Sequence, residues 1–160
     1  MLFRSFEWAT GHHIYNNTRS FQIQFGNDIE YNNLELQLYG DTENPPTLTP
    51  GTPEYIEAAT KYAKLNPTYD GNFIEEADWL RLRELALRVD LTNWVKGLVG
   101  NYLKTITLGM SVRNVALWTA YSGADPEVNM FGSRDNVGRG VDFLTLQNAR
   151  TFNFSVNLGL

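Results

Sequence analysis

The last eleven residues, 150-RTFNFSVNLGL-160, decide the fold class of this chain. From 152 to 160 every even position is apolar, and every odd position is small or polar. A two-residue period over about ten residues is typical of a β-strand whose two faces meet different surroundings. A soluble sheet offers that contrast between core and water, and an outer-membrane barrel offers it between lipid and a polar lumen. Taken alone, the strand favours the soluble sheet.

Composition excludes several classes of protein. The 160 residues are 42% hydrophobic and carry a formal net charge of -5, so the chain is too apolar for a disordered protein and too acidic for a general nucleic-acid binder. Cysteine is absent, which excludes disulfides, a thiolate metal site and a cysteine nucleophile. No apolar run reaches the roughly 18 residues of a transmembrane helix. The start, MLFRSFEWATGHH, lacks the features of a secretory signal and by itself predicts a cytoplasmic protein.

The first half of the chain predicts three extended segments and one helix. Residues 2–8 have apolar side chains on one parity, and so do residues 20–26 and 33–40, so each is predicted to be a strand. Residues 41–51 are rich in Pro and Thr and predict a loop. A short helix is expected after it, with Thr52 as cap and Pro53 in the first turn, ending before Asn66 and Pro67.

The second half predicts three long strands joined by connections of unequal length. The first strand covers 79–91, with a single bulge near Arg83 and Glu84 where the apolar parity shifts. A short connector that can form one helical turn leads to a strand at 102–118, and the long loop 120–148 precedes the final strand. Short turns at one end and long loops at the other are the layout of bacterial outer-membrane barrels.

Two further features agree with a barrel. Trp94 and Tyr102 are expected near one rim, and Trp118 and Tyr121 near the other, as in the aromatic girdles of such proteins. The charged side chains of Arg88 and Arg113 share the polar parity of their strands, so they are predicted to face the lumen. A soluble sandwich would meet both expectations too.

Four ordered blocks resemble the C-terminal region of the SusC/RagA group of TonB-dependent outer-membrane transporters. They are 6-FEWATGHHIYNNTR-19, 73-FIEEADWLRLRELAL-87, 112-VRNVALWTAYSGADPEVN-129 and 150-RTFNFSVNLGL-160. The third is the most specific, because it is similar to the group's Trp-Thr-x-Tyr-x-Gly-x-Asp-Pro-Glu-Val-Asn signature. The resemblance covers about the whole chain and favours the barrel over the soluble sheet.

The chain departs from the group's pattern in two places. Leu160 stands where the closing strand of such barrels ends in an aromatic residue, most often Phe, which the barrel-assembly machinery reads. After the Leu-Arg-Glu block the group often has a Tyr and a Leu-Pro, whereas this chain reads RVDLTNW. Both departures leave the alternating strand pattern intact.

The resemblance implies an all-β fold, with antiparallel up-and-down strands that form part of a transmembrane β-barrel and a short helix in a long loop. Residues 1–160 are expected to be the C-terminal segment of a longer protein, started at an internal Met. The signal peptide, the TonB-contacting box, the plug and most of about 22 strands would then be absent, and open edges are not tolerated in lipid.

The function that the resemblance implies is nutrient import. The intact protein would import an oligosaccharide or a peptide across the outer membrane, powered through the TonB complex and assisted by a SusD-like lipoprotein. The segment would contribute a structural wall and would not transport alone. A soluble β-rich ligand-binding module, with residues 118–121 as an aromatic ligand surface, is the competing hypothesis. A truncated product that folds only partly is the third and weaker one.

Candidate chemical sites receive mostly structural interpretations. The adjacent His12 and His13 should point to opposite faces of a strand and so not chelate one ion. Residues 138–140, GRG, lack the flanking strand and helix of a phosphate loop, and residues 16–18 match a glycosylation sequon by pattern only. We predict no catalytic, cofactor or metal site, and the sequence leaves the substrate-binding residues unknown. Four acidic residues are interpreted as solvated loop carboxylates rather than calcium ligands: Asp125, Glu127, Asp135 and Asp142.

Overall fold

The structure, a computed structural model, describes residues 1–99, 104–132 and 138–159. The chain divides into two compact units. The sheet unit consists of Met1–Thr10, Asp78–Ala120 and Asn148–Leu160, and the loop unit consists of Gly11–Ala77 and Tyr121–Gln147. The long connections after the first and third long strands therefore fold together.

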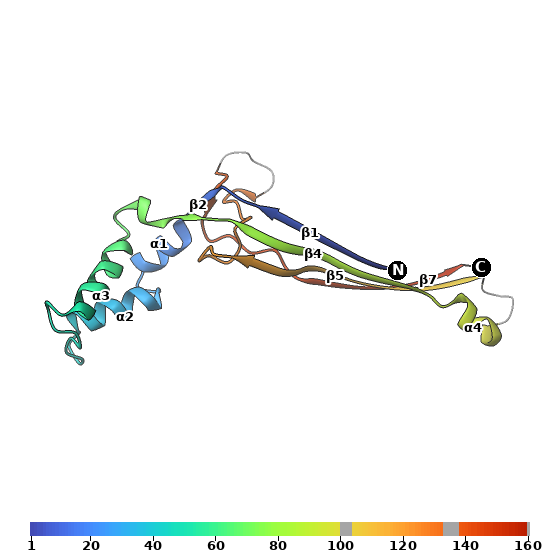
Figure 1. Cartoon of the computed structure of the whole chain (residues 1–160), viewed down its shortest axis with the longest axis horizontal. Helices are drawn as coiled ribbons and strands as arrows, with labels where there is room; N and C mark the ends of the chain where they lie inside the picture. Colours follow the sequence, from blue (N-terminus) through green and yellow to red (C-terminus); the bar gives the residue numbers. More distant parts are fainter. Residues whose placement is uncertain (100–103, 133–137, 160) are drawn as a thin grey trace. The chain divides into compact units, whose positions relative to one another are not determined.

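The sheet unit is a four-stranded antiparallel sheet in the order β1-β4-β5-β7 (Figure 1). Its strands are β1 (Leu2–Ala9), β4 (Trp79–Asp90), β5 (Thr105–Thr119) and β7 (Thr151–Gly159). All four strands were predicted, with ends within a few residues of those observed; residues 102, 103 and 160 lie outside the described part. In this sheet β1 and β7 are the two edges.

A bulge interrupts the sheet where the sequence predicts one. The pairing of β4 with β1 shifts register between Ser5 and Phe6, and its pairing with β5 shifts between Leu82 and Glu84. Across from the shift in β4, Asn114 of β5 has a φ of +56°, in the left-handed region that Asn tolerates better than most residues.

The register places the apolar and polar side chains on opposite faces, because residues directly opposite each other in an antiparallel sheet share a face. Two residues of β1 depart from this separation: Arg4 lies opposite Leu85 on the apolar face, and Phe3 lies opposite Ala86 on the polar face. The apolar face carries Leu2, Leu85, Leu87, Val89, Ile106, Leu108, Met110, Val112, Phe152, Phe154, Val156 and Leu158. The polar face carries Glu84, Ala86, Arg88, Asp90, Thr107, Gly109, Ser111, Arg113, Asn153, Ser155 and Asn157.

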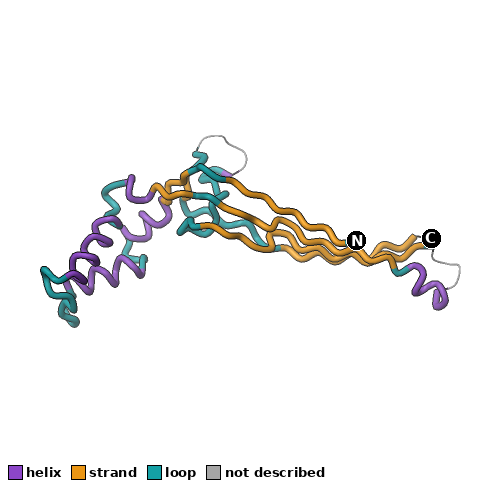
Figure 2. Tube along the Cα trace, viewed as in Figure 1, coloured by secondary structure: helices purple, strands orange, loops and turns teal. Residues whose placement is uncertain are grey.

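The regular elements of the loop unit are mainly helices, joined by long loops (Figure 2). A small sheet in the order β3-β2-β6 pairs β2 antiparallel to β3 and parallel to β6, so it joins the two long connections. The elements are β2 (His13–Asn16), α1 (Asn17–Gln24), α2 (Ile29–Tyr39), α3 (Pro53–Lys64), η1 (Asp70–Phe73), β3 (Ile74–Glu76) and β6 (Val141–Asp142).

The strands predicted at 20–26 and 33–40 are wrong, because both segments are helical. Asn16 is the N-cap of α1, where its side chain accepts a hydrogen bond from the backbone N–H of Arg19. Asp28 is the N-cap of α2 and accepts from the backbone N–H of Tyr31. Phe21 of α1 and Phe25, which caps its C-terminus, belong to the supposed strand but are four residues apart and pack together with ring centroids 4.5 Å apart and ring planes tilted by 45°. Leu34 and Leu38 form a similar pair and pack against Ala58 of α3.

The predicted helix is confirmed as α3, with Thr52 as its cap and Pro53 in its first turn. The loop between β1 and β4 thus holds three α-helices where one was expected. The connector after β4 forms an eight-residue helix, α4 (Thr92–Val99), longer than the single turn predicted. Among the described residues no helix is long and apolar enough to span a membrane.

Candidate functional site

The apolar face of the sheet is exposed. Its side chains include Phe154 at 75% exposure and Val156 at 62%, and of the whole face only Ile106 is buried. Contiguous apolar surface of this extent marks contact with a membrane or another protein. Within the described residues no second sheet packs on this face, whereas a soluble sandwich would place one there.

Aromatic side chains flank this face. Trp8, Leu80 and Trp118 lie opposite one another in a single row near the ends of the strands that lead into the loop unit, and all three are exposed. Trp94 is exposed on α4, beyond the other end of β4. These positions fit the two predicted rims, whereas Tyr102 lies outside the described residues. The prediction for Tyr121 is wrong, since this side chain is buried in the loop unit at 5% exposure.

The polar side of the sheet carries a hydrogen-bonded cluster beside the bulge. Arg81 is fully buried, and its guanidinium donates to Oδ1 of Asn114 at 2.6 Å. Nδ2 of Asn114 donates to the carbonyl of Asn148, and Nε of Arg150 donates to the carbonyl of Asn114. The bulge in β5 is thus bonded to β4 and to the segment that enters β7.

Charged neighbours extend this cluster along the polar side. The guanidinium groups of Arg81 and Arg83 lie 5.8 and 5.3 Å from the ring centroid of Trp79, and Nε of Arg83 contacts Oε2 of Glu7 at 2.5 Å. Arg113 forms an ion pair with Glu84 at 3.7 Å. Arg88 lies opposite Gly109, on the same face as Arg113. Both arginines thus lie on the polar face of the sheet, as their parity in the sequence predicts.

The loop unit has a core that includes buried polar groups. Ile14, Ala77 and Tyr121 pack together, and the Tyr121 hydroxyl donates to Oδ2 of Asp142 at 2.8 Å. Burial, with the hydrogen bond to Asp142 and its charge, raises the pKa of Tyr121 well above its usual value. Thr18 donates its hydroxyl to Oδ1 of the same carboxylate at 3.0 Å. Asp142 therefore joins both connections of the loop unit.

The interpretation of the acidic residues as solvated carboxylates is wrong for two of them. Asp125 and Asp142 are only 1% and 3% exposed, because each accepts hydrogen bonds inside the loop unit. Glu127 is half-buried and donates its backbone N–H to Asp125, and Asp135 lies outside the described residues. Within the described part of the chain, no group of three or more acidic or histidine side chains is arranged to hold a metal ion.

The other candidate positions also have structural partners. His13 begins β2 and pairs with Glu76, while the carbonyl of His12 accepts from the backbone of Ala77. Gly140, from the GRG stretch, accepts a hydrogen bond from the backbone of Tyr15. Asn16, the acceptor of the sequon pattern, is 1% exposed, and its amide nitrogen already donates hydrogen bonds to Glu75 and Ser122.

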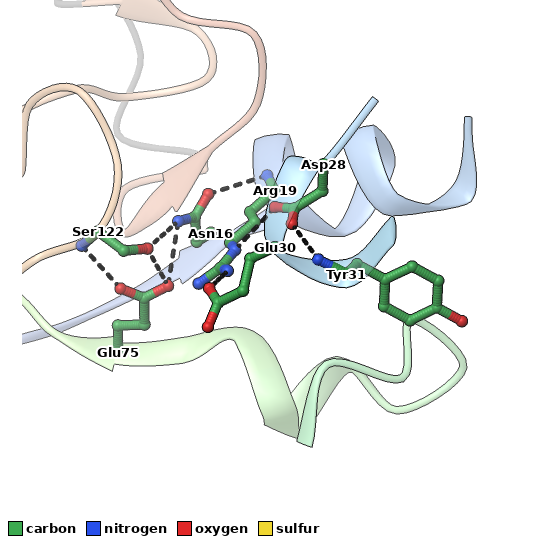
Figure 3. Close-up of polar contacts among 7 residues, drawn as sticks. All are labelled: Asn16, Arg19, Asp28, Glu30, Tyr31, Glu75 and Ser122. Atoms are coloured by element: carbon green, nitrogen blue, oxygen red, sulfur yellow. Dashed lines mark hydrogen bonds and ion pairs between the residues drawn. The ribbon is translucent and has the colours of Figure 1, made fainter. Parts of the chain in front are cut away.

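A polar cavity of about 480 Å³ opens in the loop unit. Figure 3 shows Arg19 at its wall, with Nε 3.1 Å from Asp28 and Nη2 2.5 Å from Glu30. Burial alone would lower the pKa of Arg19, but the hydrogen bonds and charges of the two carboxylates raise it above its ordinary value. The cavity is lined by Asn16, Thr18, Arg19, Gln22, Asp28, Glu30, Ser122, Gly123, Ala124, Asp142 and Thr145.

A second group of hydrogen bonds fixes the other side of this cavity. The amide of Asn16 donates to Oε1 of Glu75 and to the hydroxyl of Ser122, both at 3.0 Å. Ser122 in turn donates its backbone N–H and its hydroxyl to Glu75 at 2.9 and 2.7 Å (Figure 3). Sequence reasoning missed this cavity. The available signals were the caps Asn16 and Asp28, which bracket Arg19.

Comparisons with known proteins agree with the ordered motifs. No family model matches the chain. It is 26% identical over 165 residues to TonB-dependent receptor P3 of Formosa agariphila, across 88% of this chain and 16% of that protein. It is also 26% identical over 132 residues to TonB-dependent receptor P39 of the same organism, across 72% of this chain and 12% of the relative. The chain thus spans about a sixth or less of the length of these relatives.

Solved structures share the fold. The RagAB peptide transporter matches 98% of this chain with a TM-score of 0.60 and 20% identity, and 15% of that transporter chain is covered. The RagAB peptide importer in its 'open-open' state matches 99% of this chain with a TM-score of 0.62 and 19% identity, again over 15% of its own length. In sequence the chain is a relative of TonB-dependent receptors over most of its length, and its fold is that of part of RagAB, as its four motifs predicted.

Proposed function

We propose that residues 1–160 form the C-terminal part of the β-barrel of a TonB-dependent outer-membrane importer of oligosaccharides or peptides. The observation that carries this proposal is the exposed apolar face of the sheet, opposite a face of small and charged side chains. Lipid outside and a polar lumen inside require this distribution. The sequence and fold comparisons support the same conclusion.

The height of the apolar face supports a bilayer as its surroundings. The face consists of six rows of side chains, from the pair Ile106 and Leu158 to the row that contains Trp118, and successive rows are two residues apart except at the bulge. Two residues advance about 6.8 Å along a strand, or about 5 Å along the membrane normal at a tilt of roughly 40°. The five intervals between these ends span about 25 Å, the height of the apolar band of outer-membrane barrels.

In this proposal the segment contributes structure. In the closed barrel β7 and β1, the two edges of this sheet, would each pair with a further strand of the whole protein, so neither edge would face lipid. Transport would need the rest of the barrel, a plug, the TonB complex and a SusD-like lipoprotein, and the barrel-assembly machinery would insert the strands. The segment has no catalytic role.

The competing hypothesis, a soluble ligand-binding module, expects the apolar face to be packed and the residues at 118–121 to form an open aromatic surface. The exposed face and the burial of Tyr121 both count against it.

The proposal can be tested by the need for detergent. The purified chain is expected to form large aggregates in buffer and a uniform species in detergent micelles, as measured by sedimentation velocity. A stable monomer in detergent-free buffer would overturn the proposal. An upstream plug-coding region in frame, or a neighbouring gene for a SusD-like lipoprotein, would support it independently.

A further inference from the structure

We infer that α4 (Thr92–Val99), the helix between β4 and β5, lies on the membrane surface as an interfacial anchor and prefers anionic phospholipid headgroups. The inference rests on the proposed function, because the sheet must span a bilayer for the helix to meet one. It adds a second kind of membrane contact, outside the strands. Three features of the connection carry it: the amphipathic sequence of the helix, its attachment to the sheet, and its charge.

The sequence of the helix is apolar on one half of its circumference and polar on the other. Successive residues of an α-helix are rotated by about 100°, so residues three or four apart share a side. The apolar half contains Trp94, Val95, Leu98 and Val99, and the polar half contains Thr92, Asn93, Lys96 and Gly97. Helices with tryptophan and leucine opposite a lysine are typical of the interface between a membrane and water.

Trp94 is an apolar side chain of α4 that protein does not cover. It is 84% exposed, more than the three other tryptophans of the chain, Trp8, Trp79 and Trp118. An indole in water leaves a large apolar surface hydrated, and its burial is favourable. Tryptophan is also enriched at the headgroup level, where its ring meets apolar chains and its N–H meets polar groups. A membrane surface would supply both surroundings to Trp94.

Hydrogen bonds attach the start of α4 to the end of the sheet. The N–H of Leu91 donates to the carbonyl of Ile106 at 2.9 Å, and Oγ1 of Thr92 accepts from the N–H of Ile106 at 3.0 Å. The N–H of Thr92 donates to Oδ1 of Asp90 at 2.9 Å. Ile106 and Leu158 form the last row of the apolar face, so α4 begins where that face ends (Figure 1). In the proposed barrel this face crosses the hydrocarbon, which places the start of the helix at the level of the headgroups.

The connection carries positive charge in an acidic chain. Residues 91–104 contain Lys96 and Lys104 and no Asp or Glu, whereas the whole chain has a formal net charge of -5. The next acidic residue after Asp90 is Asp125. A lysine close to a membrane surface raises the affinity for anionic lipid about fivefold. The charge of the connection therefore favours anionic over zwitterionic headgroups.

The test places single spin labels on the full chain in phospholipid vesicles, since the chain has no cysteine of its own. Leu98→Cys labels the apolar half of α4 and Asn93→Cys the polar half. The label at 98 is expected to collide mainly with oxygen dissolved in lipid, and the label at 93 mainly with a water-soluble nickel chelate. Equal access of the chelate to both labels, or protection of both from both reagents, would overturn the inference, because the helix would then lie in water or under protein.

The lipid preference is measured by adding phosphatidylglycerol to vesicles of phosphatidylcholine. The ratio of membrane-bound to water-exposed label at 98 should rise with the anionic lipid, and Lys96→Gln should lower that ratio about fivefold. Trp94→Ala should lower it about tenfold with either lipid, through lost apolar burial. Lys61→Gln is the matched control and should leave the ratio unchanged, because Lys61 is an exposed lysine of the loop unit. A ratio that does not respond to phosphatidylglycerol or to Lys96→Gln would overturn the preference for anionic lipid.

Labels along β5 distinguish a failure of this inference from a failure of the proposed function. If labels at 106–112 alternate between oxygen and the nickel chelate while those on α4 do not differ, the sheet spans the bilayer and only the anchor is wrong. If the labels on β5 do not alternate either, the proposed function itself is contradicted.

Discussion

The two units of the chain distribute polarity in opposite ways. In the sheet unit large apolar side chains are exposed, with Phe154 at 75% and Leu87 at 41%. In the loop unit polar side chains are buried, with Asn16 at 1% and Asp142 at 3%, and each has hydrogen-bond partners. The loop unit follows the rule for proteins in water, where buried polar groups are paired. The sheet unit instead exposes an apolar face that is unfavourable in water, which is the distribution expected of a surface in contact with lipid.

The largest expected effect comes from a charge on the apolar face. Met110→Arg places a guanidinium between Leu87 and Phe154, and near the bilayer midplane it should lower the free energy of unfolding by about 2–4 kcal/mol. The measurement is a urea titration, followed by tryptophan fluorescence, of the chain reconstituted into phospholipid vesicles.

The neighbouring residue provides the control for this change. Ser111→Arg adds the same side chain one position away, on the polar face, and should cost under about 1 kcal/mol. If both variants lose the same free energy of unfolding, the two faces of the sheet meet the same surroundings, and the contrast drawn between the two units is wrong.

A smaller effect is expected from removal of the buried carboxylate of the loop unit. Asp142→Ala leaves the hydroxyl of Tyr121 buried without its acceptor and should destabilise the loop unit by about 1–3 kcal/mol. Hydrogen exchange should accelerate at the amides of Ile14 and Tyr121, while those of β5 stay protected. Exchange that accelerates equally in both units would show that they unfold as one.

The bulge offers a test within the sheet unit. Asn114→Ala removes the bonds to Arg81 and Asn148 and places a residue with a Cβ at φ +56°, for a combined cost of about 1–2 kcal/mol. Asn114→Gly keeps the backbone conformation without strain but also loses the bonds. The difference between the two variants in vesicle unfolding gives the backbone cost, and no difference would mean that the conformation at this position is unstrained.

The smallest expected effect is the loss of a contribution of Tyr121 to stability at alkaline pH. Because burial and Asp142 raise the pKa of Tyr121, the folded loop unit favours the neutral phenol over the phenolate. This contribution to stability is complete below about pH 10, the unperturbed value, and is lost as pH rises through the higher pKa of the folded state. In a phenolate absorbance titration, the wild-type chain should show one more late-ionising tyrosine than Tyr121→Phe. An equal number of late tyrosines would contradict the buried hydrogen bond.

The difference between the sheet unit and the loop unit also explains which parts of the fold the sequence predicts. Residues 79–91 and 152–160 alternate because each strand meets two different surroundings, and this pattern predicted β4, its bulge and β7. The segments around Phe21 and Leu36 also alternate, yet they are helices, since a short run of apolar residues satisfies both periods. The signals that would have identified these helices are their capping residues: Asn16 and Asp28 are the N-caps of α1 and α2, and Gly40 ends α2.

The candidate site was less predictable than the sheet. Tyr121 and Asp142 are 21 residues apart and meet only because the second connection folds back on itself. Arg19 and Ser122 lie on different connections, and no local pattern relates them. A cavity formed by long-range contacts leaves no periodic signal in the sequence, whereas each strand of the sheet unit carries its own.

The most direct test of the central claim is the accessibility of spin labels along β5 in a lipid bilayer. Labels placed singly at 106, 108, 110 and 112 are expected to collide with oxygen dissolved in lipid, and labels at 105, 107, 109 and 111 with a water-soluble nickel chelate. An alternation with a period of two residues would support the claim. Protection of both sets from both reagents would place protein on each face of the sheet and contradict it.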